Sequence, residues 1–519
     1  MKFIKRKWIA CAVIGSLAAL LVVMMKIDSR PKRTPSVARD VSASPATVTR
    51  HVPTVGFFPN TFPRDPVDIN LYLEHILVGQ ILEPLVESAP DGDISPSVAQ
   101  QWTISADART VTFIIREGIT FSNGKPVMAE DVKYSLERHL TSHSQARTFL
   151  EHITTITASD PRTLRLHLDR PYVAIFKALS RDQLGIVPAG WRFDSHSDEP
   201  LIGTGPYRAV RNENGWRLLL NPYYRDRSRV RIPEWDPIFF DAKKQQYDHL
   251  PLPDLMPFLE PEVAKSVEAT AGPVLTNYTR QRVNHFVQLS AWWNPAGPRA
   301  SDRKLQMRAM VAMRTLIEAR RAKLGFRAAT GVVPEGISGY LPEIRRPSNV
   351  HAADDGETMV RLTVLVNKKN IQLMNDPTDL ATIERDYGVR FNFSEYGVAT
   401  ADQLTDVQPD IILYSFAGGF HDPEGFLVVL TSRLNADLQS VFGADYPKYV
   451  AASSETDWNQ RARLYQDLGA ALIDNYVMVP GWKFDVISLT VPELAHVASV
   501  SYTPKLKNYF FATQDNEGR

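Results

Sequence analysis

Few residues in this chain have the types and spacing that chemistry requires. His139 and His143 are four residues apart, a spacing that places two imidazoles on one helix face, where they could bind a metal ion. No third ligand lies nearby in the sequence, so we interpret the pair as a solvated helix end. The segment Gly203–Arg208, GTGPYR, begins like a dinucleotide-binding turn. It lacks the third glycine, and Pro206 removes a backbone N–H that would face phosphate, so we expect a tight turn that enters a strand.

The chain also lacks the motifs of common catalytic centres. It contains no HExxH, GxSxG, P-loop or CxxC sequence, and its one cysteine, Cys11, permits neither an intrachain disulfide nor a cysteine-based zinc site. Many carboxylates are present, but sequence alone pairs no two of them for acid–base work. We therefore predict no enzymatic activity, no catalytic residue, no cofactor and no metal site. Hydrolysis of a peptide or ester by the purified protein would instead support the hypothesis that it is a hydrolase.

Short strands and helices must position whatever site the chain has. Alternating apolar and polar residues predict half-buried strands, and apolar residues at helical spacing predict amphipathic helices. The expected strands cover residues 110–116, 163–168, 361–366 and 411–414, and the expected helices cover 126–140, 305–319 and 458–472. Ser122-Asn123-Gly124 predicts a turn between a strand and the helix that opens at Pro126. This mixture over 519 residues predicts a mixed α/β (α+β) architecture with more than one lobe.

The charge distribution separates the first 50 residues from the rest. Residues 1–50 contain ten Lys and Arg against two Asp, which leaves 49 basic and 56 acidic residues, a net charge of −7, in the remainder. A body of that sign does not attract phosphate backbones, so we expect no nucleic acid partner.

Residues 1–27 have the pattern of a membrane-targeting segment. Four basic residues precede an uncharged run from Trp8 to Met25, whose 18 residues would span about 27 Å as a helix. This length favours an uncleaved anchor over a cleaved signal, and the nearest small-residue cleavage site, Ser36-Val37-Ala38, lies too far downstream. Residues 28–50 predict a flexible linker. The body is therefore expected to be periplasmic or otherwise extracytoplasmic, anchored to the cytoplasmic membrane by an N-terminal helix or secreted after signal cleavage.

Many residues between Leu82 and Leu140 occupy fixed spacings of one known pattern. They are Glu83-Pro84-Leu85, Asp91-Gly92, Pro96, Trp102, Phe113, Arg116, Gly118, Phe121, Gly124, Pro126, Ala129, Asp131 and Val132. Three later segments keep the same order: GTGPYRAV with NPYY at 203–224, GVVPEGISGY at 331–340, and the DP-containing segment at 411–427. Together they resemble the family 5 extracellular solute-binding proteins, the oligopeptide-, dipeptide- and nickel-binding group of ABC importers.

The resemblance implies a two-lobed periplasmic-binding-protein clamp of type II with three domains. After the anchor or signal at 1–27 and the linker at 28–50, the expected domains are a discontinuous domain I (51–85, 196–285 and 485–519), domain II (86–195) and domain III (286–484). It also implies that a monomer closes its lobes around a small-molecule or peptide ligand and docks on ABC permease subunits.

The resemblance places the ligand near the segment 411–427, where we nominate Tyr414, Phe416, Gly419, Phe420 and Asp422. In peptide-binding members an aspartate of this segment pairs with the ligand's α-ammonium, but here Gly419 occupies that position. Either Asp422 or another acid supplies the charge, or the ligand has no free α-amine, or peptide affinity has been lost. We expect free dipeptides to bind poorly. The aromatic residues could equally pack the sheet edge.

A second hypothesis also fits the sequence. A membrane-tethered sensor or assembly protein could use the same clamp without a transporter, and an uncleaved anchor slightly favours this alternative. A co-purifying ligand and neighbouring permease genes would separate the two.

Overall fold

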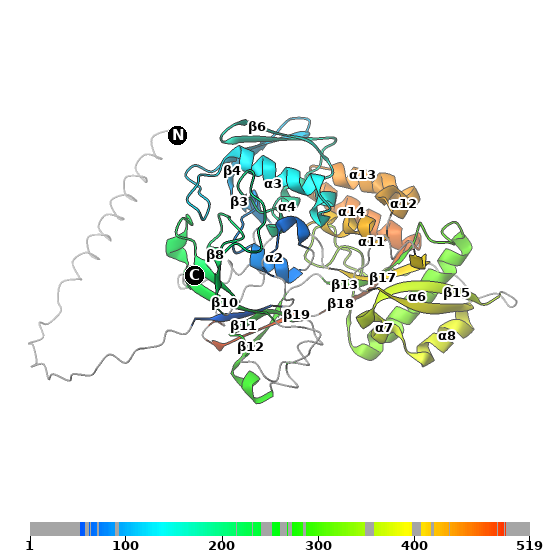
Figure 1. Ribbon diagram of the computed structural model, residues 1–519. Coiled ribbons are helices and arrows are strands. Elements are labelled where there is room, and N and C mark those ends of the chain that lie inside the picture. The colour runs from blue at the N-terminus through cyan, green and yellow to red at the C-terminus, as the bar shows by residue number, and fades with distance from the viewer. Residues whose placement is uncertain are drawn as a thin grey trace, which may run out of the picture. The chain divides into compact units, whose positions relative to one another are not determined.

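The computed structural model describes most of the chain after His51, within a compact unit that begins at Val52. The described residues are 52–57, 62, 64–69, 72–88, 93–213, 215–230, 232–239, 252–259, 267, 272–283, 287–347, 358–396, 406–416, 420–434, 436–484, 486–492 and 494. Their strands form four sheets, of which the three larger ones organise the fold (Figure 1). The smallest pairs β2 (Val86–Ser88) with β3 (Ile94–Pro96).

A four-stranded antiparallel sheet is built from one continuous stretch of chain. Its order is β4 (Ala99–Ile104), β5 (Thr110–Ile115), β7 (Thr163–Leu168) and β6 (Ile153–Asp160). The expected alternation is present, because every second residue of β5 and β7 is buried. Helix α3 (Ala129–Thr141) covers this sheet with Val132 and Leu136, which are both fully buried. Short helices η2 (Gln145–Phe149), α4 (Ile175–Ala178) and η3 (Asp182–Leu184) complete the region.

The start of α3 differs from the sequence expectation. The helix begins at Ala129, three residues after Pro126, because Pro126 forms an isolated bridge with Thr120 that closes the preceding turn. The turn itself is present at Ser122–Gly124, where Gly124 has φ +80°, a conformation that glycine adopts without strain.

The end of α3 also corrects an expectation. His139 is only 2% exposed, and its Nδ1 lies 2.7 Å from the Ser144 hydroxyl, so it is not part of a solvated helix end. Burial, followed by the nearby Arg138 charge, lowers the pKa of His139 to about 3. His143 lies beyond the helix, is exposed and contacts Asp68. The two histidines therefore have different surroundings and do not form a metal-binding pair.

A seven-stranded sheet joins segments that are far apart in the sequence. Its order is β12 (Thr279–Val283), β19 (Val486–Thr490), β11 (Leu255–Leu259), β1 (Thr54–Phe57), β10 (Glu234–Phe239), β9 (Gly215–Leu220) and β8 (Tyr207–Asn212). Strand β1 runs parallel to both neighbours, and the other pairs are antiparallel. The core under this sheet includes residues of α2 (Tyr72–Val78). Short helices η1 (Pro66–Asp68), η4 (Arg227–Arg229) and η5 (Gly272–Asn277) lie in the connecting segments.

Two of the motif segments, 82–140 and 203–224, meet beside this sheet together with Arg225. The buried Glu83 carboxylate accepts hydrogen bonds from the Thr204 hydroxyl at 2.9 Å and from the Arg225 guanidinium, whose second nitrogen lies 2.8 Å from the other oxygen. Gly205 is required because a Cβ there would lie 2.6 Å from the Gln80 carbonyl oxygen. The glycine-rich segment therefore enters β8 through a tight turn, as expected, and its glycines serve close backbone packing.

A six-stranded mixed sheet forms the third large unit. Its order is β14 (Arg327–Ala328), β18 (Met478–Lys483), β13 (Gln288–Trp293), β17 (Ile411–Phe416), β15 (Val360–Asn367) and β16 (Val389–Tyr396). Strand β15 is parallel to β16 and β17, with α7 (Lys368–Met374) and α8 (Pro377–Tyr387) between β15 and β16 (Figure 1). Helix α6 (Arg303–Leu324) packs on β13 and β18 and is longer than the sequence predicted. It begins after the capping side chain of Asp302 and ends at Gly325, whose φ is +71°.

The segment between β17 and β18 is helical. It contains α10 (Glu424–Leu427), α11 (Val429–Leu434), α12 (Leu438–Phe442), η6 (Gly443–Asp445), α13 (Tyr446–Ser454) and α14 (Trp458–Asp474). Asp457 caps α14 by accepting from the Gln460 N–H, as expected. The buried apolar residues of these helices belong to the same cluster as those of the four-stranded sheet.

Candidate ligand-binding site

Strand β17 and the residues after it carry the five nominated positions. The strand is hydrogen-bonded on both edges, to β13 and to β15, and Tyr414 within it is half-buried. Phe416 is its last residue, and the side chain of Phe416 lies outside the description, as does the whole of Gly419. Phe420 and Asp422 are both buried, at 3% and 2% exposure. Tyr414 packs against the same apolar cluster that contains Phe420, so the structure brings together three of the five nominated residues.

The Asp422 carboxylate is occupied by a buried arginine. Arg461 on α14 is 1% exposed and donates to both carboxylate oxygens, at 2.7 and 2.8 Å. Burial works against the charged guanidinium, but Asp422 outweighs it and raises the pKa of Arg461 above its usual range. Asp422 also accepts from the Glu424 N–H at 3.0 Å. Such a bidentate pair neutralises the carboxylate within the protein itself.

A second buried acid lies beside this pair. Glu424 at the start of α10 is fully buried, and its two oxygens accept from the hydroxyls of Tyr449, at 2.9 Å, and Tyr465. Burial is the main cause that raises the pKa of Glu424 to about 7, although Arg461 and both hydroxyls oppose the shift. Two acids and one arginine in close contact therefore make this a strongly polar region inside an apolar cluster.

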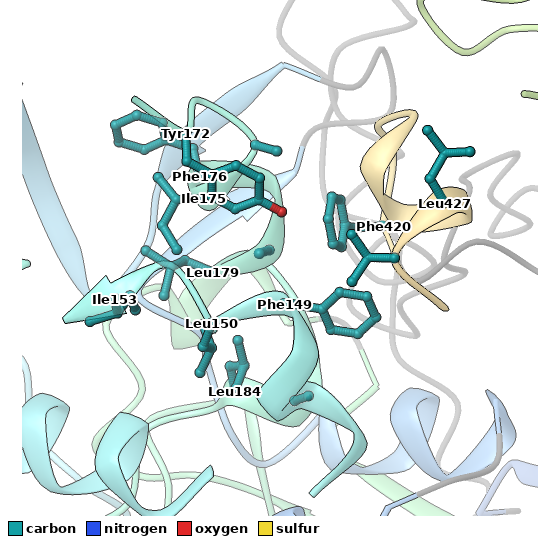
Figure 2. Packing of buried hydrophobic residues seen from close by; sticks show 14 of the residues in the cluster. Phe149, Leu150, Ile153, Tyr172, Ile175, Phe176, Leu179, Leu184, Phe420 and Leu427 are labelled. Carbon is teal, nitrogen blue, oxygen red and sulfur yellow. The ribbon is translucent and has the colours of Figure 1, made fainter. Parts of the chain in front are cut away.

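Residues from 86–195 complete the surroundings. Phe149 of η2 packs edge-on against Phe420, with ring centroids 5.1 Å apart, and the two rings lie next to each other in Figure 2. The Arg170 guanidinium lies 5.6 Å from the ring centroid of Tyr449 and donates to the Tyr449 hydroxyl at 3.5 Å. Both contacts join the region of the four-stranded sheet to the helices that follow β17.

Arg170 is held from its own side by His152. The guanidinium donates to His152 Nε2 at 2.9 Å, so the ring proton must be on Nδ1, which donates to Asp169 at 3.1 Å. Burial, and then the Arg170 charge, lower the pKa of His152, which agrees with a neutral ring.

A half-open cavity of about 310 Å³ lies at the same contact. It is lined by the turn between β4 and β5, by residues of the segment 168–176 and by Thr456 and Trp458 at the start of α14. Leu168, Ile175 and Phe176 make its walls mainly apolar, and the Trp458 side chain at its edge is 51% exposed. The volume is at the lower end of the range for small-molecule sites.

The buried acids of this region are engaged by protein donors. In the part of the chain that the structure describes, no group of three His, Cys, Asp or Glu side chains is placed to hold a metal ion. Both buried acids already accept hydrogen bonds from protein donors, Asp422 from Arg461 and Glu424 from two tyrosines. The same described residues contain no helix that is both long and apolar enough to cross a membrane, and the expected anchor at 1–27 lies outside them.

Sequence reasoning missed most of this polar cluster. Arg461 lies three residues after Trp458 and four before Tyr465, on the face of α14 that was predicted to be apolar. An arginine in such a stripe signals a buried acidic partner, since an unpaired charge is costly there. Glu424, Tyr449 and Arg170 carry no comparable signal, because only tertiary contact brings them together.

The sequence is similar to known bacterial solute-binding proteins. Residues 93–248 match the sequence profile of the bacterial extracellular solute-binding proteins, family 5 Middle. The nickel-binding periplasmic protein of Escherichia coli (strain K12) is 31% identical over 173 residues, which cover 29% of this chain and 32% of that protein. This chain thus matches only about a third of that relative's length. The periplasmic murein peptide-binding protein MppA of the same organism is 23% identical and covers 79% of this chain and 83% of the relative.

Solved structures share the fold over nearly the whole chain. The murein tripeptide-binding protein MppA of Escherichia coli superposes with a TM-score of 0.66 at 19% identity, covering 87% of this chain and 96% of that one. The ABC transporter-associated periplasmic binding protein DppA of Helicobacter pylori, solved with the peptide STSA, has a TM-score of 0.68 at 17% identity, with coverages of 89% and 97%. The fold is therefore that of type II periplasmic binding proteins. The relatives are named as periplasmic binding proteins.

Proposed function

We propose that the chain is a bacterial extracellular solute-binding protein of family 5 and serves as the solute-binding component of an ABC-type importer. Two lobes close around a short peptide or a related small solute, and the closed monomer delivers it to permease subunits. Residues 1–27 hold the protein on the cytoplasmic membrane, with the body on the periplasmic or extracytoplasmic side. We propose no enzymatic activity and no nucleic acid partner.

The match of residues 93–248 to the family profile carries this proposal. The shared fold over the rest of the chain supports the two-lobed architecture that capture by closure requires. The relatives' names include nickel and murein peptide, so family membership supports solute capture more strongly than any single ligand.

The geometry around Asp422 bears on the ligand's chemistry. Both of its carboxylate oxygens already accept from Arg461, and a ligand ammonium would have to displace that buried arginine. Breaking a buried ion pair costs several kcal/mol, about 3–5 in comparable cases. We therefore propose that the ligand binds without Asp422 as its amine partner and that free dipeptides bind poorly.

Native mass spectrometry of the full-length protein, purified in detergent, tests the capture of a solute. We expect a small molecule to co-purify and to be released on denaturation. Titration calorimetry with Ala-Ala and with its N-acetyl derivative tests the ligand's chemistry. Tight binding of Ala-Ala that depends on its free amine would contradict the proposed ligand class.

Uptake measurements separate the two functions that the clamp permits. Deletion of an importer component abolishes uptake of the co-purified solute. If the protein holds a solute but its deletion leaves uptake of that solute unchanged, the membrane-tethered sensing or assembly protein becomes the better conclusion.

A further inference from the structure

Residues 86–195 and the helices after β17 touch through side chains, and buried apolar residues of both regions belong to one cluster. Each region has its own sheet or helices, and among the described residues no helix or strand of one packs along the length of an element of the other. The contact includes the Phe149–Phe420 ring pair, which Figure 2 shows. It also includes the Arg170–Tyr449 pair and Trp458 at the cavity. A contact of this kind can form and separate as a unit, because few packed elements must come apart.

The polar half of the contact is a chain of hydrogen bonds. It runs from His152 through the Arg170 guanidinium to the Tyr449 hydroxyl and on to the buried Glu424 carboxyl, with separations of 2.9, 3.5 and 2.9 Å. Arg170 and His152 come from one region, and Tyr449 and Glu424 come from the other. The chain therefore exists only while the two regions are together.

The charges of this chain favour the joined arrangement. Arg461 is paired with Asp422, and the Glu424 carboxyl accepts from two tyrosine hydroxyls. Arg170 brings a positive charge to the far side of one of those hydroxyls, and its guanidinium also faces the ring of the same tyrosine. Separation of the regions would remove that charge and expose both aromatic contacts to water.

We propose that Arg170 and Phe149 are positioning residues that hold residues 86–195 against the helices after β17, and that they thereby set ligand affinity without touching the ligand. This inference rests on the proposed function, since capture by closure gives the contact its role. The joined arrangement is the one that a bound solute would stabilise.

Distances between spin labels on the two regions test the proposal. One label is placed at Glu117→Cys within 86–195, and the other at Gln439→Cys on α12, one of the helices after β17. Both native residues are exposed, and the full-length protein carries Cys11→Ser. Arg170→Ala should raise the ratio of separated to joined molecules by about tenfold, a typical factor for a coupling of this kind. Tyr449→Phe, which keeps the ring and removes the bridging hydroxyl, should shift it in the same direction.

The matched control is Arg165→Ala. Arg165 is an exposed arginine of β7 that donates to Ser159 of the neighbouring strand, so its loss should leave the distances unchanged. Arg170→Lys keeps the charge and should restore most of the joined population. Phe149→Leu gives an independent variant if Arg170→Ala melts below the working temperature.

Two results would overturn the inference. One is a distance distribution for Arg170→Ala that equals that of the unaltered protein, and the other is an equal shift caused by Arg165→Ala. The proposed function has a separate test: it is refuted if native mass spectrometry finds no solute bound to the protein. Unchanged distances in protein that does hold a solute would sink this inference alone.

Discussion

Replacing Glu424 with glutamine removes the only charge that this buried side chain can carry and keeps its shape. The Tyr449 and Tyr465 hydroxyls donate to the carboxyl group in the native protein, and they can also accept from an amide N–H. The substitution therefore isolates the cost of ionising a carboxyl group in this position.

The magnitude follows from the raised pKa. In the unfolded chain the Glu424 carboxyl titrates near 4.5, and in the folded protein its pKa is about 7. This difference is worth roughly 3 kcal/mol of folding free energy. Because the folded value is the higher one, the contribution is fully present below pH 4.5 and is lost as the pH rises through 7. Glutamine does not titrate, so the free energy of unfolding of Glu424→Gln should gain roughly 3 kcal/mol on that of the native protein between about pH 4.5 and about pH 8.

Urea denaturation of both proteins across this pH range measures the effect. The difference between the two unfolding free energies is the quantity to follow, because it cancels titrating groups that both proteins share. Glu117→Gln, at a carboxylate that is 83% exposed, serves as the control for the loss of a surface charge. A difference for Glu424→Gln that stays constant within about 0.5 kcal/mol, well below the effect expected from the linkage relation, would refute the assignment of Glu424 as a buried, proton-binding acid.

Three further predictions concern other buried residues. Arg461→Ala should lower the free energy of unfolding in urea by about 3–5 kcal/mol, because it leaves Asp422 buried and unpaired. The double variant Asp422→Leu with Arg461→Met removes both charges and should recover most of this loss. Gly205→Ala should lower the same free energy by about 1–3 kcal/mol, since its Cβ would meet a backbone carbonyl at 2.6 Å, whereas Gly469→Ala, with ordinary contacts only, should be tolerated. The pKa of His139 is lowered from 6.5 to about 3, so the native protein loses free energy of unfolding as the pH falls below 6.5, by as much as about 5 kcal/mol near pH 3. His139→Asn removes this titration and should make the free energy of unfolding less dependent on pH in that range. Equal acid sensitivity of the variant and the native protein would contradict this.

Much of the local structure could be predicted from the sequence. The alternation in Thr163–Leu168 and the apolar run at Ile411–Tyr414 indicate strands that the structure contains, and Asp457 was among the expected caps of α14. Each of these patterns is read within a few neighbouring residues. The same local reading placed the start of α3 at Pro126, because it could not detect the bridge that Pro126 makes with Thr120.

The candidate site was predictable only in part. The order of motifs pointed to the segment after β17, and the structure finds Phe420 and Asp422 buried there. The sequence could not show that Arg461, 39 residues away, pairs with the Asp422 carboxylate. Nor could it show that Arg170 contacts Tyr449, 279 residues away. Partners at such distances are chosen by the packing of the whole fold. The expected roles in ligand binding of all five nominated residues, Phe420 and Asp422 included, stay predictions.

The strand order of the sheets sets the order in which this chain can fold. The four-stranded sheet uses only residues 99–168, so all of its partners are available as soon as that stretch has been synthesised. In the seven-stranded sheet, β11 and β12 both pair with β19, which ends at Thr490. Pairings between distant segments are slow to form, so this sheet must wait for almost the entire polypeptide. Until then β11 and β12 have exposed edges, and a nascent chain interrupted before β19 would be prone to aggregate.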